Sequence, residues 1–456
     1  MDHSRSSRTT LSTLSDKPEK QTSEPDEAEL AALGLPPDAS PELVRQLTRI
    51  GPPPDGGLTA WLVVLSTFLV LFCIFGMVTS FGQLQSYYLT NQLAAYSKSD
   101  VAWIGSTQST LTFLGSIAAG RYFDAHGPRL LVIAGTALSI GALIGLAFCT
   151  EYYQILLAHL LFGLSGTLTY SPATAISGHW FLRRRATAVG VVVCGAGAGG
   201  VVYPLLMRAL FARLSFRDAI LSIAALNLVL MLPACVWMKA RLPPRSPPPL
   251  RALRAPWREA PYTFLVVGSA VYMLNVFSPY FNAPVLAANL LPANMEGYAV
   301  ALLQAGSFVG RAAAGVLADA LGVWVVFGGT SFASAVVLFA FWTGASGTAV
   351  GVLGLVCYGI VSGAWFTLVA AACATISPVD EIGMRLGMLW TLVGPPILAG
   401  PVVCGVLITA DGGRFNSAGL FCGATMLLAA FLMPGPKMWG AVRRCWRRET
   451  DAETAV

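Results

Sequence analysis

The chain has 456 residues, of which 55% are hydrophobic and only 11% are charged. Soluble domains carry about 25% charged residues because their surface faces water, so most of this surface must face lipid. The net charge of +6 does not indicate nucleic-acid binding, because the basic residues lie between long apolar blocks.

Motifs for catalysis and for metal binding are missing from the sequence. The nine cysteines form no CxxC pair, and the four histidines are scattered along the chain. The sequence also lacks the nucleophile-elbow, zinc-protease and nucleotide-binding patterns. We therefore expect no enzyme activity, no metal and no cofactor.

Apolar blocks of about 20 residues recur along the chain, and a helix of that length crosses a hydrocarbon core about 30 Å thick. They are preceded by residues 1–54, whose Ser, Thr, Glu, Asp and Pro content predicts a disordered cytoplasmic tail. The blocks predict about twelve membrane spans, at 60–84, 101–123, 130–148, 154–178, 186–207, 219–237, 262–286, 298–318, 324–342, 349–375, 386–408 and 418–433.

One long polar interruption divides these spans into two sets of six. The central loop 239–261 is rich in Pro and Arg, and it separates a first half (55–238) from a second half (262–433). The pattern GxxxDxxG closes the second span at 120–127 and the eighth span at 315–322, which are equivalent places in the two halves. The sequence therefore predicts an all-α polytopic membrane protein built from two six-helix halves.

The distribution of Lys and Arg predicts the orientation of the chain. Basic residues concentrate after the second and fourth spans, in the central loop and in the tail 434–456. Cytoplasmic loops of membrane proteins carry such an excess. Both termini are therefore predicted to be cytoplasmic.

Two motifs carry a family resemblance. The sequence DGG at 55–57, followed by Trp61, precedes the first span, and WFLRRRATAVG at 180–190 opens the fifth span. Both resemble signatures of the monocarboxylate porter family of the major facilitator superfamily, especially its fungal branch. The resemblance covers about residues 55–435 and implies two halves related by an axis along the membrane normal. It also implies transport of monocarboxylates, other organic acids, riboflavin or secondary metabolites.

Arg311 is the most informative single residue. It lies eight residues from Asp319, about 12 Å deeper in the eighth span and near the middle of the core. A charge at that depth is costly and normally faces a wet cavity or a partner. We interpret Arg311 as an anchor for a substrate carboxylate, and the resemblance implies an Arg at this place. The alternative is a structural Arg that helix carbonyls hold between the halves.

Further polar side chains at membrane depth are candidates for substrate binding. Each of them could equally bridge two helices, because polar side chains commonly do so in membranes. These candidates are Gln83, Tyr170, Asn275, Tyr280 and Ser307. The run Gly195–Gly200 predicts close packing of the fifth span.

Charged residues at the predicted cytoplasmic ends of spans are candidates for gating. Asp124 with Arg121 and, in the second half, Asp319 are placed to latch helices in one state and release them in another. Arg184 and Arg185 lie at the start of the fifth span. They could act in gating, or they could simply hold this helix end on the cytoplasmic side of the membrane.

Proton coupling has few candidate residues. Better-known relatives of the resembled family carry a Lys in the first span and an Asp before the span-eight Arg, where this chain has Thr79 and Ser307. Every Asp and Glu lies at a span end or in a loop, so His159 in the fourth span is the remaining titratable candidate. The alternative for His159 is a hydrogen-bonded structural role.

The leading hypothesis is a secondary carrier that moves a small, monocarboxylate-like organic anion by alternating access, with protons as a candidate coupled ion. The rival within transport is an exporter of a fungal secondary metabolite. A non-transporting nutrient sensor is the alternative from another class. The expected partners are the substrate and the lipid bilayer, with protons as a further candidate, and no nucleic acid is expected. The host membrane is predicted to be the plasma membrane, with the vacuolar membrane as an alternative.

Overall fold

The computed structural model describes residues 54–181, 185–241, 250–343, 347–377 and 381–435. These residues all belong to one structural unit, Pro53–Val456. The predicted N-terminal tail, part of the central loop and nearly all of the predicted C-terminal tail lie outside the described residues.

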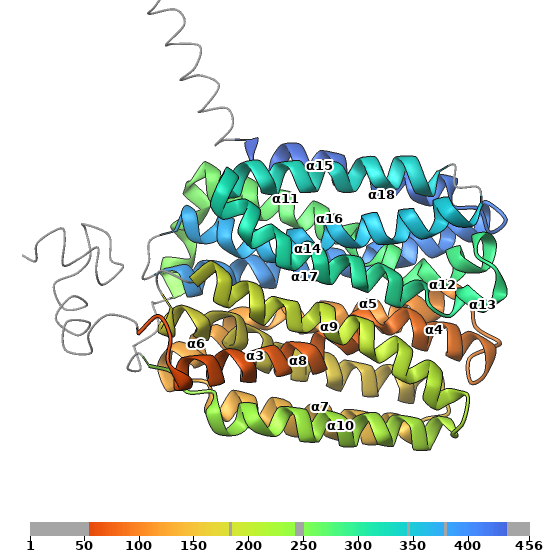
Figure 1. Ribbon diagram of the computed structural model, residues 1–456, viewed down its shortest axis with the longest axis horizontal. Coiled ribbons are helices and arrows are strands. Elements are labelled where there is room, and N and C mark those ends of the chain that lie inside the picture. Colours follow the sequence, from red (N-terminus) through yellow and green to blue (C-terminus); the bar gives the residue numbers. More distant parts are fainter. Residues whose placement is uncertain (1–53, 182–184, 242–249, 344–346, 378–380, 436–456) are drawn as a thin grey trace, which may run out of the picture. The chain divides into compact units, whose positions relative to one another are not determined.

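The regular secondary structure in the described part of the first half consists of helices. Its helices are α3 (Leu58–Thr79), α4 (Phe81–Thr90), α5 (Lys98–Leu114), α6 (Ser116–His126), α7 (Arg129–Ala147), α8 (Tyr152–Trp180), α9 (Arg185–Phe211) and α10 (Phe216–Trp237). Figure 1 shows them in red to yellow-green, beside the helices of the second half.

The described part of the second half follows the same plan, after two short 3₁₀ turns. The elements are η1 (Leu250–Arg254), η2 (Pro256–Arg258), α11 (Ala260–Val276), α12 (Ser278–Leu290), α13 (Ala293–Glu296), α14 (Ala299–Leu321), α15 (Val323–Trp342), α16 (Thr348–Thr375), α17 (Ile382–Ala410) and α18 (Asn416–Leu432).

These helices match the twelve predicted spans one by one. Among the described residues, ten helical segments are long and apolar enough to cross a membrane, and α18 is a shorter apolar helix. The remaining predicted span, 101–123, corresponds to α5 with α6, whose sequence is more polar. The chain is helical here because a bilayer offers no water to satisfy backbone N–H and C=O groups, and a helix satisfies them internally. The prediction of an all-α polytopic membrane protein is confirmed.

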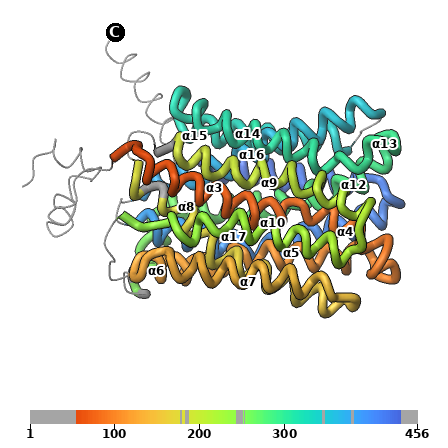
Figure 2. Tube along the Cα trace, turned by 60° about the horizontal axis from the view of Figure 1, so that its bottom comes forward, coloured from red at the N-terminus to blue at the C-terminus, as the bar shows by residue number. Residues whose placement is uncertain are grey.

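The two halves repeat the same pattern of helix neighbours. In the first half, α3 packs against α9 and α10, α8 packs against α5 and α7, and α7 packs against α10. In the second half, α11 packs against α17 and α18, α16 packs against α14 and α15, and α15 packs against α18. When the spans are numbered from one to six within each half, the same five pairs of spans are in contact in both halves. Figure 2 shows the helices running side by side.

The contacts that join the halves include α5 and α6 with α17, α9 with α14 and α16, and α4 with α12. Glycines let backbones approach closely within and between the halves. A Cβ on Gly76 would lie 2.8 Å from Gly199, and one on Gly197 would lie 2.9 Å from the Cα atom of Phe308 on α14. The close packing predicted for Gly195–Gly200 is confirmed, and the first of these contacts joins α3 to α9 while the second crosses between the halves.

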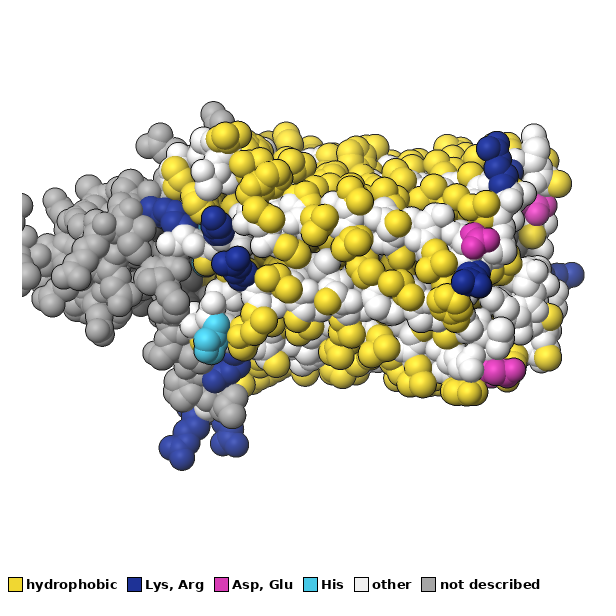
Figure 3. All heavy atoms as spheres, turned by 90° about the horizontal axis from the view of Figure 1, so that it is seen from below, with side chains coloured by type: hydrophobic (Ala, Val, Ile, Leu, Met, Phe, Trp, Pro, Cys, Tyr) yellow, Lys and Arg dark blue, Asp and Glu magenta, His cyan; other side chains and the backbone are white. Residues whose placement is uncertain are grey.

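The outer surface of the helices is apolar. Leu, Val, Ile and Phe side chains are exposed along the spans, as on α7, α10 and α15. On the face shown in Figure 3, charged side chains gather at the two ends, and the band between them is free of charge. A multi-pass integral membrane protein requires such a surface, because the band contacts lipid.

Candidate functional site

Arg311 lies in the middle of α14, and its side chain is 1% exposed. Its Nε donates a hydrogen bond of 3.2 Å to Ser307 Oγ, one turn earlier on the same helix. The Tyr280 hydroxyl of α12 donates to the same Ser307 oxygen over 3.3 Å and lies 2.9 Å from Ser362 Oγ of α16. The structure thus brings together three of the predicted binding residues, Arg311, Ser307 and Tyr280.

The guanidinium of Arg311 is only partly satisfied. Its buried Nη2 has no hydrogen-bond partner among the described residues. Its carbon lies 4.7 Å from the centre of the Phe366 ring, a cation–π contact. The charged or titratable groups that act on it are Tyr280, Tyr170 and Cys194, and none of them is a carboxylate. The site therefore holds a buried positive charge with a free donor, which a bound oxyanion would complete.

Tyr170 of α8 is the fourth predicted binding residue near Arg311. Its ring lies 5.1 Å from that of Phe75 in the first half and 5.3 Å from that of Trp390 on α17 in the second half. Tyr170 therefore lies at the boundary of the two halves, close enough to Arg311 to act on its charge.

The remaining two binding candidates do not join this group. Asn275 of α11 donates to Thr425 Oγ1 of α18 over 2.9 Å and accepts a bond from Ser278, so it bridges helices within the second half. Gln83 of α4 is half-buried beside Gly82, where a Cβ would lie 2.6 Å from the carbonyl of Tyr280. Their predicted role in substrate binding stays a prediction.

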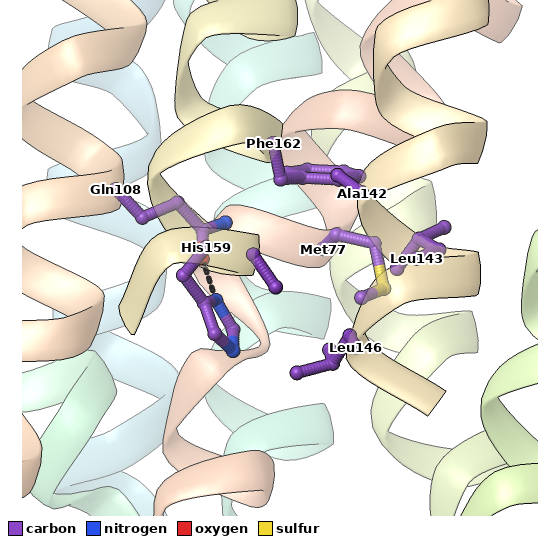
Figure 4. A pocket seen from close by; sticks show the side chains of 8 residues that line it. Met77, Gln108, Ala142, Leu143, Leu146, His159 and Phe162 are labelled. Atoms are coloured by element: carbon purple, nitrogen blue, oxygen red, sulfur yellow. Dashed lines mark hydrogen bonds between the residues drawn. The ribbon is translucent and has the colours of Figure 1, made fainter. Parts of the chain in front are cut away.

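His159 lies inside the first half, where both ring nitrogens have partners. Nε2 is 3.1 Å from the Tyr88 hydroxyl of α4, and Nδ1 is hydrogen-bonded to the side-chain carbonyl of Gln108 on α5. Figure 4 shows His159 and Gln108 on the wall of a small cavity. This cavity has a volume of about 10 Å³ and is lined by α3, α5, α7 and α8. That volume holds about one water molecule and no substrate.

The gating candidates differ in where they lie. Asp124 of α6 faces the other half, because a Cβ on Gly383 at the start of α17 would lie 3.7 Å from its Oδ2. A carboxylate beside a helix N-terminus is stabilised by the helix dipole. Arg121, one turn before Asp124, is half-buried, whereas Asp319 is exposed and forms no ion pair within the described residues. The side chains of Arg184 and Arg185 lie outside the described residues.

A second buried arginine, which no sequence motif indicated, lies on α17, the helix that faces Asp124. Arg385 of α17 donates from Nη1 and Nη2 to the two oxygens of Glu259, over 2.7 and 2.6 Å. Its Nε donates to Glu381 over 2.9 Å. These hydrogen bonds hold the pKa of the Glu259 carboxyl below its ordinary value, although burial acts in the opposite direction. The spacing of Glu381 and Arg385, four residues apart at a helix start, was the signal available in the sequence.

The halves contact each other on both sides of Arg311. Toward one end, α6 packs against α17 around Asp124. Toward the other end, α4 packs against α12, and the Arg208 guanidinium of α9 lies 4.0 Å from the centre of the Tyr298 ring. The structure is therefore an occluded conformation, in which Arg311 is closed off from both ends.

Two six-helix halves that meet around a buried charge define the fold of a membrane transporter. The structure is similar to the crystal structure of the human organic anion transporter MFSD10 (TETRAN), with a TM-score of 0.64 at 17% identity. The match covers 82% of this chain and 98% of that one. At this identity the likeness shows the fold alone.

The sequence comparisons show the family. The family model of the Major Facilitator Superfamily matches residues 58–401, so the chain belongs to this superfamily and is a transporter. The Fujikurins efflux protein of Gibberella fujikuroi is 32% identical over 95% of each chain. The Aspyridones efflux protein apdF of Emericella nidulans is 34% identical over 85% of this chain and 79% of its own. The MFS-type transporter 1 of an Ophiocordyceps species is 33% identical over 83% of this chain and 85% of its own.

These findings confirm the predicted superfamily and the predicted transport function. The names of the relatives describe efflux or MFS-type transport and not monocarboxylate transport. The finer assignment to the monocarboxylate porter family therefore stays a prediction, and the predicted alternative, metabolite export, has the better support. The names of these three relatives describe transporters and not nutrient sensors.

Proposed function

We propose that this transporter exports a small organic anion of the secondary-metabolite class by alternating access around Arg311. The observation that carries the proposal is the buried guanidinium between the halves, whose Nη2 has no partner among the described residues. A buried unpaired charge is costly in a membrane protein. A carboxylate or another planar oxyanion removes that cost, because it accepts two parallel hydrogen bonds from a guanidinium.

The direction of transport rests on the relatives. Two of them, 32% and 34% identical, are named as efflux proteins for fungal metabolites. In this proposal the substrate enters from the cytoplasm and leaves on the far side of the plasma membrane. Uptake of a small monocarboxylate, the leading hypothesis from the sequence, becomes the alternative outcome of the test.

The residues around Arg311 have distinct roles in this proposal. Ser307 and Tyr280 hold the Nε edge of the guanidinium, so that the outer nitrogens remain for the anion. Tyr170 contributes a ring from the first half. Asp124 and the start of α17 form a latch that must part when the site opens to the cytoplasm.

Proton coupling, where it occurs, proceeds through the substrate's own acidic group in this proposal. Among the described spans, Asp and Glu lie only in the outer turns. His159 has partners on both ring nitrogens and serves as a structural group of the first half.

The test is accumulation of labelled organic acids in inside-out vesicles under an imposed pH gradient. Wild type is compared with Arg311→Gln and with Arg213→Gln, a matched change at an exposed arginine. We expect saturable accumulation that falls at least about 30-fold in Arg311→Gln, because truncating one partner of a buried charge pair costs 2 kcal/mol or more. Arg213→Gln should transport like wild type.

Two outcomes would overturn the proposal. If wild-type vesicles accumulate no acid beyond vesicles without the protein, while right-side-out vesicles take it up, the protein is an importer. If Arg311→Gln accumulates acid as fast as wild type does, Arg311 does not bind the substrate.

A further inference from the structure

Aromatic side chains from both halves meet beside Arg311. All are at least nine-tenths buried, and together we call them the central aromatic cluster: Phe75, Phe113 and Tyr170 from the first half, and Phe366 and Trp390 from the second half. They come from five different helices, α3, α5, α8, α16 and α17. No motif of the sequence pointed to this cluster.

Three ring contacts of the cluster cross the boundary between the halves. Phe113 and Trp390 stack at 5.2 Å between ring centres, with an angle of 20° between the ring planes. Tyr170 meets Trp390 edge to face at 5.3 Å, and Phe75 meets Phe366 edge to face at 5.9 Å. Stacked and edge-to-face pairs are the arrangements that aromatic rings prefer.

The cluster touches the charged centre directly. The Arg311 guanidinium lies 4.7 Å from the centre of the Phe366 ring, and Phe366 is the ring that faces Phe75 across the boundary. A molecule whose anionic group binds Arg311 therefore places the atoms next to that group among these rings.

Alternating access requires these contacts to break. When the halves separate at either end, the rings of the first half lose their partners on the second half. Unpaired apolar surface is then exposed to water in the cavity. A ligand with a flat aromatic body covers that surface and offers the same stacked and edge-to-face contacts, whereas a saturated body of equal size offers apolar contact alone.

We infer that the substrate is an aromatic or conjugated planar acid, with its anionic group on Arg311 and its ring system between Phe366 and Trp390. The inference rests on the proposed function, because it assigns the substrate class of that same site. Phe366 and Trp390 are the specificity-determining residues, and Arg311 is required for every acid.

The experiment compares two acids with the same carbon skeleton, 1-naphthoate and decahydronaphthalene-1-carboxylate, in the inside-out vesicles. We expect wild type to prefer 1-naphthoate by about tenfold in initial rate at low concentration, the size of effect that aromatic pairs produce. Phe366→Leu and Trp390→Leu should reduce this preference to about twofold or less. Phe366→Tyr keeps the ring and should keep the preference.

Phe431→Leu is the matched control, because Phe431 lies on α18 and is 66% exposed on the surface that faces lipid. It should keep the wild-type preference. The readout is the ratio of the transport rates of the two acids. A variant that only disturbs the position of Arg311 lowers both rates by the same factor and leaves this ratio unchanged. Thermal melting in detergent checks that each variant is folded.

The outcomes separate this inference from the proposed function. Equal transport of both acids by wild type, or a preference that survives both Leu variants, would overturn the aromatic substrate class and leave anion export standing. Transport of neither acid, together with none of the other labelled acids, would overturn the proposed function itself.

Discussion

Arg311 and Arg385 are both buried in the second half, with 1% and 2% of their surface exposed, yet their surroundings are opposite. Arg385 directs its three donor nitrogens at two carboxylates, Glu259 and Glu381. Arg311 has one serine, one aromatic ring and a nitrogen without a partner among the described residues.

A structural arginine therefore differs from a ligand-binding one in whether carboxylates of the fold neutralise its charge. Arg385 joins the start of α11 to the start of α17, the helix that also faces Asp124 of the first half. Its charge is neutralised in the fold, so its removal should cost stability. The charge of Arg311 is not neutralised, so its removal should cost transport and not stability.

The largest effect on stability is expected for Arg385→Met. This change removes three charge-assisted hydrogen bonds and should lower the free energy of unfolding by about 2–3 kcal/mol. Thermal unfolding in detergent measures it, with Arg213→Met as the control at an exposed position. Equal midpoints for Arg385→Met and Arg213→Met would show that the Glu259 contact contributes nothing.

Arg311→Met should shift stability in the other direction. Replacing an unneutralised buried charge with an apolar side chain of similar length should leave the free energy of unfolding unchanged or raise it by up to about 2 kcal/mol. The same thermal measurement, without added acid, tests this. A midpoint as low as that of Arg385→Met would mean that Arg311 is a second structural arginine, as the sequence left open.

Gly197→Val tests whether the packing of α9 against α14 keeps water away from Arg311. Because a Cβ at this position lies 2.9 Å from Phe308, the larger side chain should wedge the halves apart at a cost of about 1–2 kcal/mol. Labelling by phenylglyoxal at Arg311, followed by mass spectrometry, should then increase, while labelling at Arg385 stays the same. Gly190→Val on the same helix is the control, since nothing lies within 4 Å of its Cβ position.

If Arg311 is labelled equally in the Gly197 and Gly190 variants, the contact of α9 with α14 does not close the site.

The smallest effect is a pH dependence at Glu259. Its pKa is lowered in the folded state, so its contribution to stability is complete above the ordinary Glu pKa of about 4.3 and is lost as the pH falls through the lowered value. Because the Glu259 side chain is 45% exposed, the contribution should stay under about 1 kcal/mol.

Unfolding midpoints of wild type and Glu259→Gln test this pH dependence. They should differ by a constant amount between pH 5.5 and 7 and converge in more acidic solution. A difference that grows on acidification would contradict the lowered pKa.

Most of the fold could be predicted from the sequence, because the bilayer imposes a length and an apolarity that each span must meet. The repeated GxxxDxxG pattern and the polar central loop also predicted the two halves. Arg311 was identifiable for the same reason, since a charge in the middle of an apolar span is conspicuous.

The central aromatic cluster and the Arg385 contacts could not be predicted in this way. An aromatic residue such as Phe75 or Trp390 fits an apolar span equally well whether it contacts lipid or a neighbouring helix. The sequence pattern therefore does not distinguish the two positions. Glu259 and Arg385 are 126 residues apart, and only the packing of α11 on α17 brings them together. Asn275 is the opposite case. It is a polar residue that the sequence indicated as a binding candidate, but in the structure it bridges α11 and α18.

The role of Arg311 is tested by equilibrium binding of labelled aromatic acids, such as 1-naphthoate, to purified wild type, Arg311→Met and Arg213→Met. We predict saturable binding that Arg213→Met keeps and that weakens at least about 30-fold in a folded Arg311→Met. Equal binding by wild type and Arg311→Met would contradict the central claim that this arginine holds the transported anion between the two halves.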